Sequence, residues 1–218
     1  MNATASFFDS LLSRWILSLY LHLLLLWIFT SLRLIFVQGL PCLKAMLVDS
    51  LIACTGSPGT GKTTLCSSLP MVLSMAHIAE QEGCLGAVQS DGAAEIDIAA
   101  LVDSWQAPRS AIIDGHLSHL LPVEAILILR CHPEVLRKRL EERGYSPEKV
   151  QANVEIELLG GPWNDLIADE RPILEIDCSL ESRQAIVAQW IDDGCPHSTT
   201  ADDAIDWVQS LVDERNPL

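Results

Sequence analysis

The feature that most limits the possible folds is the segment at residues 56–63, which reads Gly-Ser-Pro-Gly-Thr-Gly-Lys-Thr. It follows an apolar run that predicts a buried strand, Leu51–Thr55, and it leads into a predicted helix, Thr63–Leu69. Glycines at these positions let successive backbone N–H groups turn inward and surround phosphate oxygens. The following helix presents its positive N-terminus to the same oxygens. The pattern therefore predicts a strand–loop–helix phosphate-binding unit, and its flanking elements argue against a chance glycine-rich turn.

Three side chains of this loop have the chemistry that a nucleoside triphosphate and Mg²⁺ require. Lys62 can reach the β and γ phosphates, and the Thr63 hydroxyl can ligate Mg²⁺. Thr64 adds a second hydroxyl at the start of the helix. These residue types predict a kinase or an ATPase.

A second apolar run, Ala111–Ile113, ends in Asp114, and His116 follows two residues later. In a sheet that carries a phosphate-binding loop, such a strand brings its carboxylate beside Mg²⁺ and the attacking group. In extended chain Asp114 and His116 would point to the same side. His116 could then orient a water molecule or move a proton. The alternative is that Asp114 caps a turn and His116 only packs.

Four basic residues cluster in an otherwise acidic part of the chain: Arg137, Lys138, Arg139 and Arg143. Arg139 and Arg143 are four residues apart and therefore share a face of the predicted helix. Phosphoryl transfer needs cations that neutralise the transferring group, and a lid arginine supplies one while excluding water. We assign this role to Arg143, whereas Arg137 and Lys138 fit a solvated face.

The rest of the chain alternates short apolar runs with helical patterns. Further strands are predicted at 124–129 and 173–176, and helices at 133–143, 183–191 and 202–212. Short apolar strands that alternate with helices indicate a mostly parallel sheet with helices on both faces. The expected class is therefore α/β.

Charge and cysteine content exclude some functions. Residues 46–218 carry 11 basic and 28 acidic residues, a net charge of −17. A domain this acidic repels the phosphate backbone of nucleic acids, so broad nucleic-acid binding is not expected, whereas a basic protein partner fits.

The seven cysteines are odd in number and have no Cys-x-x-Cys spacing. Reduced thiols in a cytoplasmic protein are therefore expected in place of disulfides or zinc.

The first 45 residues differ in composition from the rest. Residues 15–37 are apolar and carry no formal charge from Trp15 to Leu32, which is long enough for a transmembrane helix. A signal peptide fits less well, because no clear small-residue cleavage site follows. Alternatively, Met46 directly precedes the first strand and is the biological first residue. We therefore divide the chain into a hydrophobic extension, residues 1–45, and a phosphate-binding domain, residues 46–218.

Several stretches together resemble one family. TGSPGTGKTT, DGHLSH, LRCHP, RLEERGYSPEKVQANVEIE and EID are similar to the adenylate kinase isoenzyme 6 family of archaea and eukaryotes. The resemblance covers residues 48–212. It implies a nucleoside monophosphate kinase fold, with a lid near Glu142–Ala152 and a monophosphate-binding segment between Ser74 and Ile98.

The resemblance also implies an activity and site residues. The activity is ATP + AMP ⇌ 2 ADP with Mg²⁺, accompanied by ATPase activity and a role in maturing the small ribosomal subunit beside a basic ribosomal protein. Alternatives are an assembly ATPase with incidental kinase activity, and a membrane-anchored nucleotide-binding protein. Matching positions imply catalysis by Lys62, Asp114, His116 and Arg143. They imply that Thr63 and Asp114 bind Mg²⁺. The residues implied to bind ATP are Gly59, Gly61, Lys62, Thr63, Thr64 and Arg143.

One departure from the family concerns the acceptor. No Lys or Arg occurs between Lys62 and Arg109, although a monophosphate kinase normally binds its acceptor phosphate with arginine. Arg109, Arg130 or Arg139 would have to serve. The sequence therefore predicts weak acceptor binding.

Overall fold

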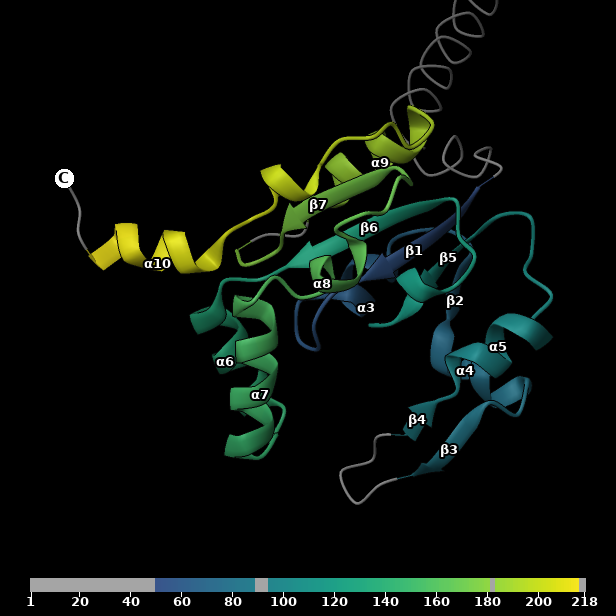
Figure 1. The fold of residues 1–218 in the computed structure, drawn as a ribbon, viewed down its shortest axis with the longest axis horizontal. Helices are drawn as coiled ribbons and strands as arrows, with labels where there is room; N and C mark the ends of the chain where they lie inside the picture. The colour runs from purple at the N-terminus through teal and green to yellow at the C-terminus, as the bar shows by residue number, and fades with distance from the viewer. Residues whose placement is uncertain (1–49, 89–93, 181–182, 216–218) are drawn as a thin grey trace, which may run out of the picture. The chain divides into compact units, whose positions relative to one another are not determined.

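The computed structural model describes residues 50–88, 94–180 and 183–215 (Figure 1). All of them belong to one compact unit of the chain, Lys44–Leu218. The predicted extension, residues 1–45, and its candidate membrane segment lie outside these ranges. Within the described ranges, no helix has the length and apolar character that crossing a bilayer requires.

The centre of the fold is a five-stranded sheet in the order β2-β5-β1-β6-β7. All neighbouring strands are parallel, which confirms the predicted sheet. The first apolar run forms the central strand and is buried along its whole length. Edge strand β2 was not predicted, because three residues carry too little periodicity. The bounds are β1 Leu51–Thr55, β2 Val72–Ser74, β5 Ala111–Asp114, β6 Ala125–Arg130 and β7 Ile173–Asp177.

Helices cover both faces of this sheet, as predicted. One core lies between the strands and helices α3 and α9, through Leu65 and Trp190. The other lies between the strands and helices α4, α5 and α8, through Met75, Leu101 and Leu166. Successive strand residues alternate between the two cores, because side chains of a strand point to opposite faces. The bounds are α3 Lys62–Cys66, α4 Met75–Gln81, α5 Ile98–Ser104, α8 Trp163–Leu166 and α9 Gln184–Asp192.

The predicted lid segment, Glu142–Ala152, lies at the turn of a helical hairpin, which we call the lid hairpin. Helix α6, Pro133–Glu142, ends at a turn where Gly144 has φ +74°, and α7, Pro147–Leu158, returns. The Ser146 side chain caps α7 by accepting the backbone N–H of Lys149. A small core joins the two helices through Leu136, Leu140, Val150 and Val154.

The predicted monophosphate-binding segment, residues 74–98, contains α4 and an antiparallel hairpin. Strands β3, Leu85–Val88, and β4, Ala94–Ile96, pair with each other outside the main sheet. Residues 89–93 between them lie outside the described ranges. In Figure 1 this hairpin and the α6–α7 hairpin extend to the same side of the sheet.

Two predicted elements have bounds that differ from the observed ones by more than one residue. Helix α3 ends at Cys66, before the expected Leu69. The tail contains a short 3₁₀ turn, Ala201–Asp203, and then α10, Trp207–Arg215, in place of one helix from 202 to 212. The break has a physical cause, because the backbone N–H of Ile205 donates to the Glu175 carboxylate at 2.8 Å.

Candidate functional site

The phosphate-binding loop runs from the end of β1 to the start of α3 and is held in shape by its neighbours. Gly56 has φ +140°, and a Cβ there would lie 2.3 Å from the carbonyl oxygen of Leu129 in β6. Gly59 has φ +94°, and a Cβ there would lie 2.7 Å from a methyl group of Leu136 in α6. Glycine is therefore required at both positions by conformation and by contact.

The Lys62 side chain folds back over this loop. Its Nζ donates to the carbonyl oxygens of Gly56, at 2.7 Å, and Ser57, at 2.9 Å. Burial lowers the pKa of Lys62, and the nearby Cys54 and Asp114 oppose the shift. The ammonium group thus lies inside the loop, where the phosphates of a nucleotide would approach it.

Thr63 and Asp114 meet beside the loop. The Thr63 Oγ1 donates to Asp114 Oδ2 at 3.0 Å, although the residues are 51 positions apart. The parallel register Cys54↔Asp114 between β1 and β5 explains this proximity. A hydroxyl and a carboxylate oxygen are suitable ligands for Mg²⁺, which keeps several water molecules and takes the rest from phosphates. No group of three His, Cys, Asp or Glu side chains that could hold a metal occurs in the described part of the chain.

His116 does not lie on an extended strand together with Asp114, although the sequence predicts it. Strand β5 ends at Asp114, so the argument that both residues share one side of an extended chain is wrong. His116 lies in the following turn, where its carbonyl oxygen accepts the Thr55 hydroxyl at 2.9 Å. Burial lowers the pKa of His116, and the positive charge of Lys62 lowers it further. The imidazole is therefore neutral at neutral pH.

His119 is a buried histidine in the short 3₁₀ turn Ser118–Leu120 that follows His116. It is almost completely buried, at 2% exposure. Its Nδ1 lies 2.8 Å from Thr55 Oγ1, and its Nε2 lies 3.1 Å from Asp165 Oδ2. Burial lowers the pKa of His119, although the hydrogen bond to Asp165 opposes the shift. The second histidine of the DGHLSH stretch was the only sequence signal for this contact.

One cleft, which we call the lid-side cleft, lies where the loop faces the end of helix α6 and the residues after β7. It brings together four of the residues expected to bind ATP: Gly59, Gly61, Thr64 and Arg143. Arg139 lines the same cleft, and its guanidinium donates to the carbonyl oxygens of Cys178 and Ser179 at 2.9 Å each. The remaining lining residues are Thr60, Leu65, Cys178 and Leu180.

A second cleft lies along the first residues of the loop. His116, His119 and Asp165 line it, with Asn153 and Ile156 of α7. The other lining residues are Gly56, Ser57, Pro58, Leu117, Gly161 and Pro162. The described part of the segment 74–98 supplies no lining residue to either cleft.

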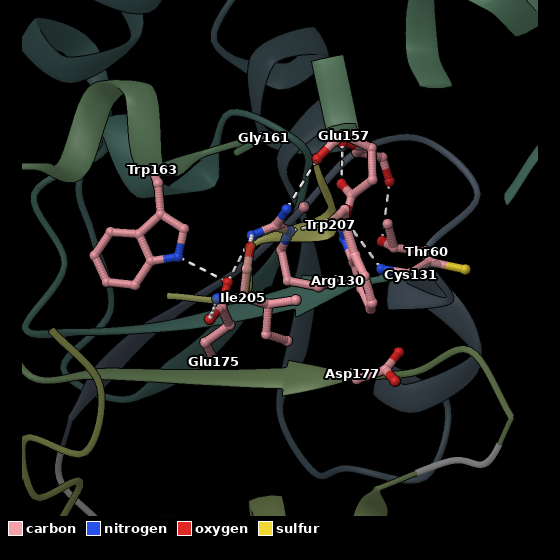
Figure 2. A network of polar contacts seen from close by, with 12 residues as sticks. Thr60, Arg130, Cys131, Glu157, Gly161, Trp163, Glu175, Asp177, Ile205 and Trp207 are labelled. Atoms are coloured by element: carbon pink, nitrogen blue, oxygen red, sulfur yellow. Dashed lines mark hydrogen bonds and ion pairs between the residues drawn. The ribbon is translucent and has the colours of Figure 1, made fainter. Parts of the chain in front are cut away.

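None of the three arginines considered for the acceptor phosphate lies in this second cleft. Arg130 is fully buried and bonded to Glu157 and Glu175 (Figure 2), so its candidacy was wrong. Arg109 precedes β5, at the amino end of the strands, whereas the loop follows the carboxyl end of β1. Arg139 lines the first cleft.

Comparisons with known proteins give a family model and several named relatives. A family model described as an AAA domain matches residues 52–160. A protein named "Putative adenylate kinase" from Pyrococcus abyssi is 38% identical over 147 residues, which cover 65% of this chain and 82% of that protein. A protein of the same name from Archaeoglobus fulgidus is 33% identical over 174 residues, which cover 75% and 94%. Another from Halobacterium salinarum is 35% identical over 144 residues, which cover 63% and 85%.

Proposed function

The chain belongs to the archaeal-type adenylate kinase family, and on that premise we propose that it transfers the γ-phosphoryl group of ATP to AMP. The observation that carries the proposal is the pair of clefts that share one phosphate-binding loop. A transferase needs two substrate sites with the reacting phosphate between them, so that both substrates are held in position. The cleft on the lid side suits ATP, and the second cleft suits the acceptor.

The proposed chemistry is electrostatic. Lys62 and Arg143 would neutralise charge on the transferring group, since preorganised cations are the main source of stabilisation in phosphoryl transfer. Thr63 and Asp114 would hold Mg²⁺, which would supply positive charge close to the phosphate oxygens. The neutral His116 would orient the attacking oxygen of AMP and, in the hydrolytic side reaction, would accept the proton of the attacking water molecule.

One assay tests the proposal directly. ADP formation from ATP and Mg²⁺ is measured with and without AMP, and with CMP or UMP in its place. The proposal expects AMP to accelerate ATP consumption and two ADP to form for each ATP consumed. ATP consumption that AMP does not change would reject the kinase assignment in favour of an ATPase.

A hydrolytic side reaction is supported by the acceptor cleft itself. Neither Lys nor Arg lines that cleft, and no basic residue occurs between Lys62 and Arg109. The same span carries several acids, among them Glu80, Glu82, Glu95, Asp97 and Asp103. A bidentate arginine normally supplies strong charge-assisted hydrogen bonds to a phosphate, and none is present in the described lining.

We therefore expect weak AMP binding and a sizeable share of AMP-independent ATP hydrolysis. AMP is titrated into the complex with a non-hydrolysable ATP analogue, and ATPase rates are measured without AMP. Each missing charge-assisted hydrogen bond should weaken AMP binding by roughly 1.5–3 kcal/mol. Micromolar AMP affinity together with negligible hydrolysis would show that other cations complete the acceptor site.

Replacement of His116 by alanine should impair turnover more than ATP binding. We expect ATP affinity to change by at most about a few-fold and hydrolysis to fall by about 10²-fold, the scale of a positioned acid–base group. His197→Ala is the matched control, because His197 is an exposed histidine in the loop after α9 that lines neither cleft. Equal losses of binding and turnover would instead mark His116 as structural.

The pH profile gives a second readout for His116. Its pKa is lowered from the usual 6.5, so the imidazole becomes protonated mainly in the acid range. Turnover should therefore not depend on this group at neutral and alkaline pH, and it should fall as the pH drops through the lowered pKa. The acid limb should disappear in His116→Ala and persist in His197→Ala. An acid limb that the His116 variant retains would assign it to another group.

The proposal also includes a protein partner and a cellular location. The net charge of −17 on residues 46–218 supports a basic protein as partner, and the family resemblance supports a ribosomal protein of the small subunit in the cytoplasm. Anchoring through residues 15–37 remains the competing setting. Fractionation of the native protein and determination of its N-terminal residue distinguish the two.

A further inference from the structure

A buried polar network lies directly beneath the phosphate-binding loop (Figure 2). Its centre is Arg130, the last residue of β6, whose side chain is fully buried. Arg130 Nε donates to Glu157 Oε1 and its Nη1 donates to Glu175 Oε1, both at 2.7 Å. Two indole N–H groups complete the network: Trp163 donates to Glu175 at 2.7 Å and Trp207 donates to Glu157 at 3.1 Å.

Glu157 connects this network to the loop. It lies in the last turn of lid helix α7 and is completely buried. One carboxylate oxygen accepts from Arg130, from the backbone N–H of Cys131 and from Trp207. The other accepts the hydroxyl of Ser57 at 2.6 Å. Three donors thus fix the carboxylate, and the carboxylate in turn fixes Ser57.

Ser57 is in direct contact with the groups that surround the phosphates. Its carbonyl oxygen accepts from Lys62 Nζ at 2.9 Å and from the Thr60 hydroxyl at 2.9 Å. Gly161 closes over the Ser57–Glu157 contact, since a Cβ there would lie 3.3 Å from Glu157 Oε2 and 3.5 Å from Ser57 Oγ. A continuous set of contacts therefore runs from the base of the lid to the ammonium group of Lys62.

We propose that Glu157 is a positioning residue of the phosphate-binding loop, because it holds the Ser57 hydroxyl and thereby the carbonyl oxygen next to Lys62. A buried carboxylate is costly unless it is paired, so a location beneath the loop has to be compensated by these donors. Glu157 touches no reacting atom, and its effect reaches the nucleotide through Ser57. The inference depends on nucleotide binding by the loop, whichever acceptor the enzyme uses.

Four variants test this role: Ser57→Ala, Glu157→Gln, the double variant and Glu175→Gln. Ser57→Ala breaks the link and leaves the Arg130–Glu157 pair intact. Glu157→Gln replaces a charge-assisted bond by a neutral one. Glu175→Gln is the matched control, because Glu175 is the other carboxylate partner of Arg130 and bonds to no loop atom among the described contacts.

The measurements are the Kd of a non-hydrolysable ATP analogue, kcat and KM for ATP, and Tm. Ser57→Ala and Glu157→Gln should each weaken analogue binding by about tenfold, the effect of one hydrogen bond to a charged group. The double variant should bind no worse than Ser57→Ala alone, because both substitutions act through the same Ser57–Glu157 contact. Glu175→Gln should lower Tm as Glu157→Gln does and leave analogue binding within about twofold of the wild type.

Three results would overturn the proposal: analogue binding by Ser57→Ala that equals the wild type, losses that add in the double variant, or an equal loss of binding in Glu175→Gln. Additive losses would mean that Ser57 acts on the nucleotide without Glu157. If Glu157→Gln does not fold, Glu157→Asp replaces it in the cycle, since it keeps the charge beside Arg130 and withdraws the carboxylate from Ser57. AMP dependence is not measured, so failure of the AMP assignment leaves these outcomes unchanged.

Discussion

Replacement of Lys62 by alanine is expected to reduce ADP formation by on the order of 10²–10³-fold or more while the protein stays folded. The ammonium group of Lys62 bonds only to carbonyl oxygens of its own loop among the described contacts. When a triphosphate enters the loop, the same group can turn to the β and γ oxygens. Its loss removes a cation from the transferring phosphate, where it acts mainly on the transition state.

The measurement is the initial rate of ADP formation, together with circular dichroism and Tm of the variant. Lys138→Ala is the matched control, because Lys138 is an exposed lysine on α6 that lines neither cleft. It should retain wild-type turnover. A folded Lys62→Ala protein with near-normal turnover would show that the loop is not the site of the reaction.

Replacement of Arg130 by methionine should lower the free energy of unfolding by about 3–5 kcal/mol, the scale for breaking a buried ion pair. Both of its carboxylate partners are buried, Glu157 at 0% and Glu175 at 2% side-chain exposure. Without the guanidinium, two buried carboxylates would face each other with no cation between them. Chemical denaturation with urea gives the value.

Two further variants serve as controls for this measurement. Arg137→Met removes a partly exposed arginine of α6 that bonds to Gln151, and it should cost little. Arg130→Met/Glu175→Gln should recover part of the lost stability, because only one buried carboxylate then lacks its partner. If Arg130→Met had normal stability and a raised KM for AMP, the arginine would be an acceptor ligand after all.

The two predictions give different roles to Lys62 and Arg130, although the sequence alone relates both residues to phosphate binding. Both residues are cations, yet Lys62 lies in the phosphate-binding loop and Arg130 lies in a buried network with two carboxylates. The structure predicts a loss of rate for the first and a loss of stability for the second. Arg139 is intermediate, because it lines the lid-side cleft and also bonds to the backbone of residues that follow β7.

The sequence by itself was sufficient to predict the strands, the loop and the helix whose structure depends mainly on residues close together in the chain. The run Leu51–Thr55 and the glycines after it were sufficient for a strand, a phosphate-binding loop and a helix. The apolar runs at 111–113, 124–129 and 173–176 were sufficient for three more parallel strands. Asp114 was predicted to lie beside Mg²⁺, and its carboxylate accepts the hydroxyl of Thr63, the other predicted Mg²⁺ ligand.

Only the tertiary structure decided which polar residues are buried and what they bind. The sequence pattern around Arg130 is the same whether its side chain faces solvent, a phosphate or a buried carboxylate. Its partners Glu157 and Glu175 are 27 and 45 residues away, and they meet it only because β6 pairs with β7 and α7 returns over the loop. His119 depends in the same way on Asp165, 46 residues away. A buried ionic group is stable only where distant segments supply its partners, so its role is set by the packing of those segments and not by its local sequence.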